Sequence, residues 1–359
     1  MKPKVALIYL SYFSEPYLDE VILSLSKLNY PKDQLMLIIV ENASTDRSDA
    51  IIREQVLPKS GKELPEIIYL PQEKNTGFAS GNNLGIQRAL LEGAEYVYFL
   101  NNDAKLQSDA LRHAIALAES DVKIGSVQSL MLLWQNPQKV NSTGGMVHFL
   151  GFGFVRDNGE FVKNITAKEG EEIAYASGAA VLYRARTLQE VGLLDPYLFL
   201  YHEDLELGWR IRLAGYRNVL SVKSIAYHHY EFSRSIQKYY WMERNRLFVH
   251  FSHLKLSTLV LLSPWLFGLE IALLFFAIKG GWISEKLLVY REWLRSKTWS
   301  YLKQKRKESA ILRKTTDQDI VKLFTGRIEH QDVASPFLNQ YVNPVLALIW
   351  GMMKFLIRW

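Results

Sequence analysis

The triplet Asn101-Asn102-Asp103 places two amides and a carboxylate directly after five apolar or aromatic residues, 96–100. Such a run is typical of a strand that is buried on both faces. In an open α/β sheet, ligands bind just beyond the carboxyl ends of the strands. Carboxylate and amide oxygens suit Mg²⁺ or Mn²⁺, so Asp103 is a candidate metal ligand. The alternative is an ordinary polar turn. Taken by itself, the triplet favours this alternative over a metal site.

Two later clusters also carry titratable side chains. Glu203-Asp204 follows the apolar and aromatic run 198–201 and opens a helical segment at 205–214. Carboxylates at a helix start often act only as caps, but an acidic pair at a cleft can supply a general base. His228-His229 ends an apolar strand at 219–227. One of these histidines could complete a metal site with Asp103, or serve as a structural hydrogen-bonding group.

Two earlier polar stretches suit a nucleotide. Glu41 ends the apolar strand 35–40 and could accept hydrogen bonds from a ribose or base, while Ser44 or Asp46 caps the next helix. The stretch 75–85 is rich in glycine and asparagine, and we expect a loop there that lets a ligand approach the backbone closely. The helix expected at 86–91 would then offer its first amides to an anion. Small residues at 176–180 would let another molecule or helix pack closely.

The elements that must position these residues alternate along the chain. Apolar runs predict strands at 5–10, 35–40, 67–70 and 97–100, and apolar spacing predicts helices at 18–28, 48–56 and 109–119. This alternation predicts a mostly parallel sheet with helices on both faces. Because each strand ends in a polar loop, the loops should gather along one edge of the sheet.

Composition bounds the class of protein. A chain of 359 residues holds one large domain with an appendage, or two domains. A hydrophobic content of 48% excludes a disordered protein, and the absence of cysteine excludes disulfides and thiolate metal sites. The apolar run at the N-terminus is too short for a signal peptide and is expected to form the first strand.

The C-terminal third predicts contact with a membrane. Residues 256–278 are apolar over a length that could cross a bilayer, although Pro264 and Glu270 lie within them. A spanning helix, a re-entrant hairpin, an in-plane helix and a buried helix pair all remain open. Residues 279–314 contain eleven lysines or arginines and three glutamates, a net charge of +8 in a chain of net charge +6. Tryptophans and tyrosines are interleaved with them, and a last apolar helix is expected at 345–359; both features suit an anionic membrane surface. So local a charge does not indicate a nucleic-acid partner.

In their order and spacing, these motifs resemble the inverting family 2 glycosyltransferases of the GT-A fold, particularly the bacterial rhamnosyltransferase-like branch, over about residues 4–250. The matching segments are Glu41-Asn42-Ala43-Ser44-Thr45-Asp46, the stretch 75–85, Leu100-Asn101-Asn102-Asp103, Gly192-Leu193-Leu194-Asp195, Glu203-Asp204-Leu205-Glu206-Leu207, Arg210 and Gly215-Tyr216. The resemblance implies an α/β GT-A domain at 1–250, a Rossmann-like mostly parallel sheet flanked by helices. A helical, membrane-associated region is expected at 251–359.

The resemblance also implies roles for single residues. Asp204 would be the catalytic base, and Asp103 would bind the Mg²⁺ or Mn²⁺ that bridges the donor diphosphate, with His228 beside it and His229 as the second choice. The residues implied in holding the nucleotide sugar are Ser11, Tyr12, Glu41, Asn75, Gly77, Asn82, Asn102 and Asp103. Those implied on the acceptor side are Glu203, Ser177, Gly178 and Arg210.

Two residues depart from the family's pattern. Glu41 replaces the more usual aspartate, and Asn101 replaces the first aspartate of the metal motif. The second change leaves one carboxylate for the ion, which weakens metal binding.

The function expected from the resemblance is transfer of a sugar from a nucleotide-diphosphate donor, dTDP-rhamnose or a UDP-sugar, to a hydroxyl of a lipid-linked or surface-glycan acceptor. The expected location is the cytoplasmic face of the cell membrane, and a homo-oligomer is left open. One alternative is a catalytically inactive homologue that acts as a membrane-bound partner in glycan assembly, but the joint presence of Asp103, Asp204 and His228 disfavours it. A nucleotidyltransferase would need a glycine-rich basic phosphate loop near the N-terminus, and residues 10–16 contain neither glycine nor a basic residue.

Overall fold

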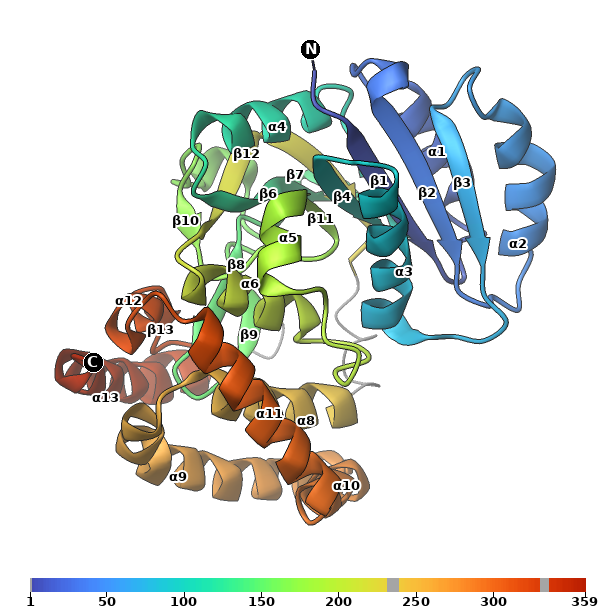
Figure 1. Cartoon of the computed structure of the whole chain (residues 1–359). Helices are drawn as coiled ribbons and strands as arrows, with labels where there is room; N and C mark the ends of the chain where they lie inside the picture. The colour runs from blue at the N-terminus through green and yellow to red at the C-terminus, as the bar shows by residue number, and fades with distance from the viewer. Residues whose placement is uncertain (1, 231–238, 330–335) are drawn as a thin grey trace.

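A mixed β-sheet forms the centre of the molecule (Figure 1). The structure is a computed structural model that describes residues 2–230, 239–329 and 336–359. Within these residues the sheet has ten strands, ordered β10-β12-β6-β11-β4-β1-β2-β3, with β5 paired to β12 and β7 to β6. A second sheet has the order β13-β8-β9.

The strands are β1 (Val5–Ser11), β2 (Leu35–Glu41), β3 (Glu66–Pro71), β4 (Tyr96–Asn101), β5 (Ala104–Leu106), β6 (Ile124–Leu133), β7 (Asn136–Ser142), β8 (Gly145–His148), β9 (Gly153–Val155), β10 (Glu172–Ile173), β11 (Ala180–Arg184), β12 (Arg217–His228) and β13 (Phe324–Thr325). The helices are α1 (Leu18–Ser26), α2 (Ser48–Ile51, continued by a π-helical turn at Ile52–Val56), α3 (Gly77–Leu91), α4 (Ala110–Ser120), α5 (Ala185–Val191), α6 (Glu203–Leu213), α8 (Tyr239–His253), α9 (Leu256–Gly280), α10 (Ile283–Trp293), α11 (Ser296–Leu312), α12 (Asp317–Val321) and α13 (Asn343–Leu356).

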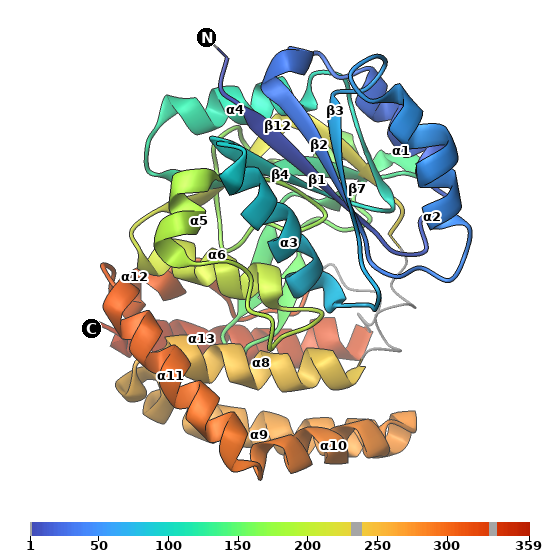
Figure 2. The same cartoon turned by 45° about the vertical axis from the view of Figure 1, so that its right-hand side comes forward.

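The N-terminal half of the sheet is parallel, as its continuous apolar strands predict. Strand β1 lies between β2 and β4, and its register pairs Ser11 with Glu41 and Leu10 with Asn101. The carboxyl ends of these strands therefore meet at one edge. Helices α1, α2 and α4 cover one face of the sheet, and α3, α5 and α6 cover the other (Figure 2). The predicted strands, and the helices at 18–28, 48–56 and 109–119, are confirmed to within a few residues.

The loop predicted at 75–85 is wrong, because helix α3 begins at Gly77. The glycines of this stretch serve close packing of the helix on the sheet. A Cβ at Gly85 would lie 2.7 Å from Ile8 Cγ2, and one at Gly81 would lie 2.6 Å from Leu10 Cδ1. Since any larger residue would push α3 away from β1, these glycines are needed where the helix crosses the strand.

The remaining strands bring a distant segment back to the end of β4. Strand β11 runs antiparallel to both β4 and β6, and β12 runs parallel to β6. Near its end β12 also pairs with β5, which places His228 opposite Ala104. This register sets the histidine pair beside the 101–103 turn.

The C-terminal helices pack on the α6 side of the sheet domain (Figures 1 and 2). One apolar core contains Leu205 and Trp209 of α6 together with Leu262 of α9 and Trp350 of α13. A helical C-terminal region is thus confirmed. The boundary predicted near residue 250 falls inside α8 and stays a prediction.

Candidate active site

A cavity of about 720 Å³ opens at the carboxyl edge of the sheet. This volume lies within the range of roughly 300–1,000 Å³ that is typical of small-molecule sites. The ends of β1, β2, β4 and β12, the start of α3, the 199–201 loop and the start of α8 contribute to its wall. Its lining residues are Leu10, Tyr12, Phe13, Pro16, Tyr17, Asn42, Asn75, Gly77, Phe78, Asn101, Asn102, Asp103, Phe199, Leu200, Tyr201, His228, His229, Tyr230 and Trp241.

Asp103 and His228 meet in this cavity, as the metal-site hypothesis requires. His228 Nε2 lies 3.3 Å from Asp103 Oδ1. The neighbouring backbone fixes the pair, because the His229 amide donates to the Asp103 carbonyl at 2.8 Å and the Trp134 amide donates to the His228 carbonyl at 3.0 Å. The ring of His229 instead lies 5.2 Å from the ring of Tyr17, centroid to centroid. Of the two histidines, His228 is therefore the one whose ring faces the carboxylate.

Asn141 holds the other side of the His228 ring and was not identified from the sequence. Its Oδ1 lies 2.9 Å from His228 Nδ1, and the side chain is buried in β7. An amide oxygen accepts, so a proton on Nδ1 is held by this contact, and in the neutral ring Nε2 is then the nitrogen that can bind a metal. Histidines that bind metals usually donate their second nitrogen in this way.

The donor set fits a divalent ion that completes its coordination with substrate oxygens. The 3.3 Å between the two ligand atoms is close to the ~3 Å that separates neighbouring ligands bound at about 2.1 Å in an octahedron. Imidazole and carboxylate together suit Mn²⁺, and Mg²⁺ is commonly held by one or two carboxylates plus phosphates. Among the described residues, no group of three histidine, aspartate or glutamate side chains could hold a metal. Donor phosphates would therefore have to supply further ligands.

Aromatic side chains form two walls of the cavity. Phe199 stacks on Trp241 of α8 at a centroid distance of 4.9 Å, and Tyr12 packs edge-on against Phe13 at 4.6 Å. Asn102 Nδ2 donates to the Tyr12 carbonyl at 2.6 Å and so connects the wall formed by Tyr12 and Phe13 to the 101–103 turn. Flat apolar surfaces of this kind can stack against a nucleobase or the apolar face of a sugar.

Two of the residues predicted to hold the nucleoside, Ser11 and Glu41, have side-chain partners within the protein and are not among the lining residues of the cavity. The buried Ser11 hydroxyl lies 2.9 Å from the Ser14 hydroxyl. The Glu41 carboxylate accepts from the amides of Ala43 and Ser44 at 3.0 and 2.9 Å, and from the Ser44 hydroxyl. Neither Ser11 nor Glu41 is among the lining residues, so both shape the loops that carry Tyr12 and Asn42.

The anion site was predicted at the first amides of a helix at 86–91, but these residues lie inside α3, which begins at Gly77. The first amides of α3 have protein partners. Asn75 Oδ1 accepts from the Gly77 amide at 2.8 Å, and the Phe199 carbonyl accepts from the Phe78 amide at 2.8 Å. Asn75 and Gly77 line the cavity. Asn82 does not, because it is buried within α3 and its Nδ2 donates to the Phe78 carbonyl at 3.0 Å.

Glu203 and Asp204 differ in their hydrogen bonds. Asp204 accepts from the amides of Gly178 and Leu205 at 3.1 and 2.7 Å. Burial raises the pKa of Asp204, and these amides oppose the rise by favouring the ionised form. Burial and the neighbouring Asp204 charge raise the pKa of Glu203 well above its usual range. Its Oε2 has no hydrogen-bond partner among the described residues. Asp204 is thus the member of the pair that is arranged to carry charge.

Asp204 is not among the lining residues of the cavity, but it lies close to Phe78, which is one of them. Both side chains approach Gly178, where an added Cβ would lie 2.9 Å from Phe78 Cζ and 3.8 Å from Asp204 Cβ. The adjacent Ser177 is held by its amide, which donates to the buried Gln128 Oε1 at 2.9 Å. Ser177 and Gly178 therefore form the backbone support for Asp204.

The loop before Asp204 is strained and is held from α8. Phe199, Tyr201 and His202 have φ values of 59°, 66° and 67°, the left-handed region that non-glycine residues rarely adopt. The buried Asn245 Nδ2 lies 2.9, 3.0 and 2.7 Å from the carbonyls of Leu198, Leu200 and Tyr201. Asn245 thereby links the first C-terminal helix to the segment that presents the acidic pair.

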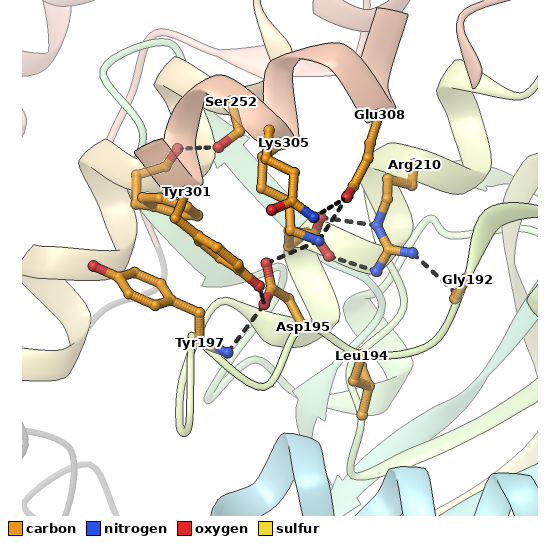
Figure 3. Close-up of polar contacts among 12 residues, drawn as sticks. Gly192, Leu194, Asp195, Tyr197, Arg210, Ser252, Tyr301, Lys305 and Glu308 are labelled. Carbon is orange, nitrogen blue, oxygen red and sulfur yellow. Dashed lines mark hydrogen bonds and ion pairs between the residues drawn. The ribbon is translucent and has the colours of Figure 1, made fainter. Parts of the chain in front are cut away.

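Arg210 lies away from the cavity and holds the 191–193 loop. Its guanidinium pairs with Glu206 at 2.6 Å and donates to the Gly192 carbonyl at 3.0 Å (Figure 3). The same figure shows Asp195 between two residues of α11: the Tyr301 hydroxyl donates to it at 2.7 Å, and Lys305 Nζ lies 3.3 Å away. These contacts fasten the 192–195 motif and α6 to the C-terminal helices.

Comparisons with known proteins agree with this fold. The family model described as glycosyl transferase family 2 matches residues 7–192, just over half of the chain. The low-salt glycan biosynthesis hexosyltransferase Agl10 of Haloferax volcanii is 24% identical over 157 residues, 41% of this chain and 47% of that protein. The galactofuranosyltransferase GlfT1 of Mycolicibacterium smegmatis is 23% identical over 189 residues, 50% of this chain and 56% of that protein. The chain thus spans about half the length of these relatives.

Solved structures share the fold at low sequence identity. The mannosyltransferase PcManGT from Pyrobaculum calidifontis, in complex with GDP-Man and Mn²⁺, has a TM-score of 0.52 and 17% identity, with 87% of each chain covered. Residues 1–349 of S. aureus TarS, in complex with UDP-GlcNAc, have a TM-score of 0.51 and 16% identity, covering 92% of this chain and 95% of that one. The predicted GT-A-like fold is thereby confirmed. By its sequence match, this chain belongs to glycosyl transferase family 2.

Proposed function

We propose that this protein is a metal-dependent inverting hexosyltransferase that transfers a sugar from a nucleoside-diphosphate donor to a hydroxyl of a glycan or lipid-linked acceptor. The observation that carries the proposal is the meeting of Asp103 and His228, backed by Asn141, in a cavity whose lining residue Phe78 lies close to Asp204. Two structural neighbours, in complex with GDP-Man and Mn²⁺ and with UDP-GlcNAc, support a donor of this class. Within it we retain dTDP-rhamnose or a UDP-sugar, and the rhamnosyltransferase-like branch, as the finer proposal.

The mechanism follows from a single ionised base. Asp204 accepts the proton of the acceptor hydroxyl while the hydroxyl oxygen bonds to the anomeric carbon. The bond from that carbon to the diphosphate oxygen breaks as the new bond forms, so the configuration inverts without a sugar–enzyme intermediate. A divalent ion held by Asp103 and His228 would stabilise the charge that develops on the diphosphate. The aromatic walls position the donor and exclude water.

The experiment combines ligand binding with an Asp204→Asn variant. A thermal-shift screen of nucleoside diphosphates, with and without Mn²⁺, should reveal one nucleotide whose stabilisation of the protein depends on the ion. Asp204→Asn should melt as the wild type does, bind that nucleotide equally, and lose transfer at least ~100-fold. Near-wild-type turnover in the variant would refute the base assignment. Failure of every nucleotide to stabilise the protein would favour the inactive-homologue alternative.

We propose the cytoplasmic face of the cell membrane as the location, with a lipid-linked or growing surface glycan as acceptor. The support is helix α9, which among the described residues is the one helix long and apolar enough to cross a bilayer. Only 11% of its most apolar window is buried in the protein, so it is not an ordinary core helix.

A further inference from the structure

Glu270, near the middle of α9, belongs to an ion cluster that joins three helices. Its carboxylate contacts Arg246 of α8 and lies 2.8 Å from Lys286 Nζ of α10. Lys286 is fully buried and also lies 2.6 Å from Glu243 of α8. Arg246 further donates to the carbonyl of Leu150, outside the C-terminal helices, at 2.9 Å. The polar side of α9 is thus anchored to the body of the protein.

The side of α9 that faces away from the rest of the protein carries an exposed apolar stripe. Large apolar side chains between 44% and 70% exposed recur every three, four or seven residues along it: Leu256, Val260, Phe267, Ile271, Phe275 and Ile278. At 100° per residue these positions fall within about 100° of one another around the helix. The buried residues Thr258, Leu262 and Ala277 lie on the other side, where Trp265 and Phe276 are nevertheless partly exposed. The helix therefore rests on the protein along one face and presents the apolar face outward.

Helix α13 and the turn before it repeat this arrangement. Its exposed stripe, between 48% and 69% exposed, consists of Phe337, Tyr341, Val345, Leu348, Met352 and Phe355. The end of the chain returns to the start of α9, where Trp359 Nε1 donates to Thr258 Oγ1 at 2.8 Å. The mostly apolar helix α9 and the amphipathic helix α13, joined at one end, thus each leave an apolar stripe without cover among the described residues.

Basic residues flank these stripes and favour an anionic lipid surface as the occupant. Lys255 precedes α9 and the exposed Lys279 stands at its end, while the exposed Arg358 follows α13. On the neighbouring α10, Arg291 is also exposed. An exposed apolar face bounded by cations favours contact with an anionic lipid surface, because buried apolar area and charge attraction both strengthen such binding. Part of the predicted basic surface is used internally, because Lys305 pairs with Asp195 and Arg306 donates to the Leu254 carbonyl.

We infer that α9 and α13 bind an anionic bilayer by lying in its plane, with both ends of α9 on the same side of the membrane. This inference deepens the membrane location proposed above. A spanning α9 would withdraw Glu270 from both of its cations. A re-entrant α9–α10 hairpin would separate Lys286 and Glu270 from Glu243 and Arg246, which α8 and the Leu150 contact hold in place. Only the in-plane orientation keeps the ion cluster together and immerses both stripes.

The first test is co-flotation of the purified chain with vesicles of phosphatidylglycerol and phosphatidylcholine. We expect binding to the mixed vesicles and at least tenfold weaker binding to phosphatidylcholine alone. The double variant F267D/F275D should bind the mixed vesicles at least tenfold more weakly than the wild type, and F355D should also bind more weakly. Leu91→Asp is the control, because Leu91 is an even more exposed apolar residue at the end of α3, far from the stripes in the sequence, and it should bind like the wild type. Wild-type binding by F267D/F275D would overturn the inference.

The second test decides the orientation. Because the chain contains no cysteine, Ser257→Cys and Lys279→Cys place single thiols at the two ends of α9. With protein added to preformed vesicles, a membrane-impermeant maleimide should label both thiols to the same extent. Protection of one thiol until the vesicles are lysed would show a spanning helix and refute the in-plane orientation. A stable dimer that covers Phe267 and does not bind vesicles would assign the stripe to a second copy of the chain.

Both tests use no nucleotide, so their outcome is separate from that of the proposed function. Vesicle binding by a chain that transfers no sugar would leave the lipid contact standing and refute the enzyme. Transfer to a soluble acceptor by a chain that does not bind vesicles would support the enzyme and refute the lipid contact.

Discussion

Replacing Asn141 with leucine tests the contact that supports His228 and leaves both proposed metal ligands, Asp103 and His228, unchanged. The side chain is 1% exposed and its Oδ1 faces His228 Nδ1 at 2.9 Å, so leucine fills a similar volume but cannot accept the proton. Without that acceptor the ring can rotate or change tautomer, and Nε2 is no longer held toward Asp103. Loss of such a supporting contact typically lowers metal affinity about 10–100-fold, or roughly 1.4–2.7 kcal/mol.

The assay titrates Mn²⁺ and has two readouts. One is the melting temperature of the protein with a saturating nucleoside diphosphate, and the other is the rate of transfer with the donor. The apparent dissociation constant for Mn²⁺ should rise about 10–100-fold, and excess Mn²⁺ should restore much of the rate. Asn158→Ala is the control. Asn158 contacts the far side of Asn141 only at 3.5 Å and does not touch the histidine.

An unchanged Mn²⁺ affinity in a folded Asn141→Leu protein would refute the role given to this contact. If His228→Ala also left the Mn²⁺ affinity unchanged, His228 would not be a metal ligand. A loss of rate that excess Mn²⁺ does not restore would show that Asn141 acts on something other than the ion.

Three further predictions follow from the same contacts. Because burial raises the pKa of Asp204 and the base must be ionised, the transfer rate should fall on acidification at a higher pH than for an ordinary aspartate; a pH–rate profile that stays flat through that range would contradict the assignment. Lys286→Met should lower the free energy of unfolding by about 3–5 kcal/mol, since it leaves two buried carboxylates to share Arg246; denaturant unfolding measures this against Lys279→Met, an exposed lysine that should cost little. Asn245→Leu removes the donor that holds the left-handed 198–202 loop, so kcat should drop at least ~10-fold through displacement of Asp204; a variant that is destabilised but keeps its kcat would assign Asn245 to stability alone.

The central part of the fold follows from local pattern. Strands β1, β2 and β4 are continuous apolar runs, and such runs are buried on both faces wherever the rest of the chain goes. Their polar ends must then gather at one edge, which is why Asp103 and Tyr12 could be placed at a ligand cavity from sequence alone. Helices α1 and α4 likewise follow from apolar spacing.

The local sequence pattern gave a wrong prediction where the packing of a helix on the sheet outweighed the helix propensity of its residues. Glycine and asparagine disfavour helices, so residues 77–85 were predicted as a loop. The structure makes them helical because Gly81 and Gly85 let α3 sit against the side chains of β1. The packing gain outweighs the local preference, and only the register of α3 on β1 reveals it.

The sequence by itself determined which residues could do chemistry and that a parallel sheet would bring their loops together. Only the tertiary structure decided that His228 faces Asp103, that Asn141 supports it across 87 residues, and that Glu270 in an apolar helix is held by Arg246 and Lys286. Periodicity is a property of a short segment, because it follows from the repeat of a helix or strand. These pairings depend instead on strand register and helix packing between distant segments, and a single sequence carries no local mark of either.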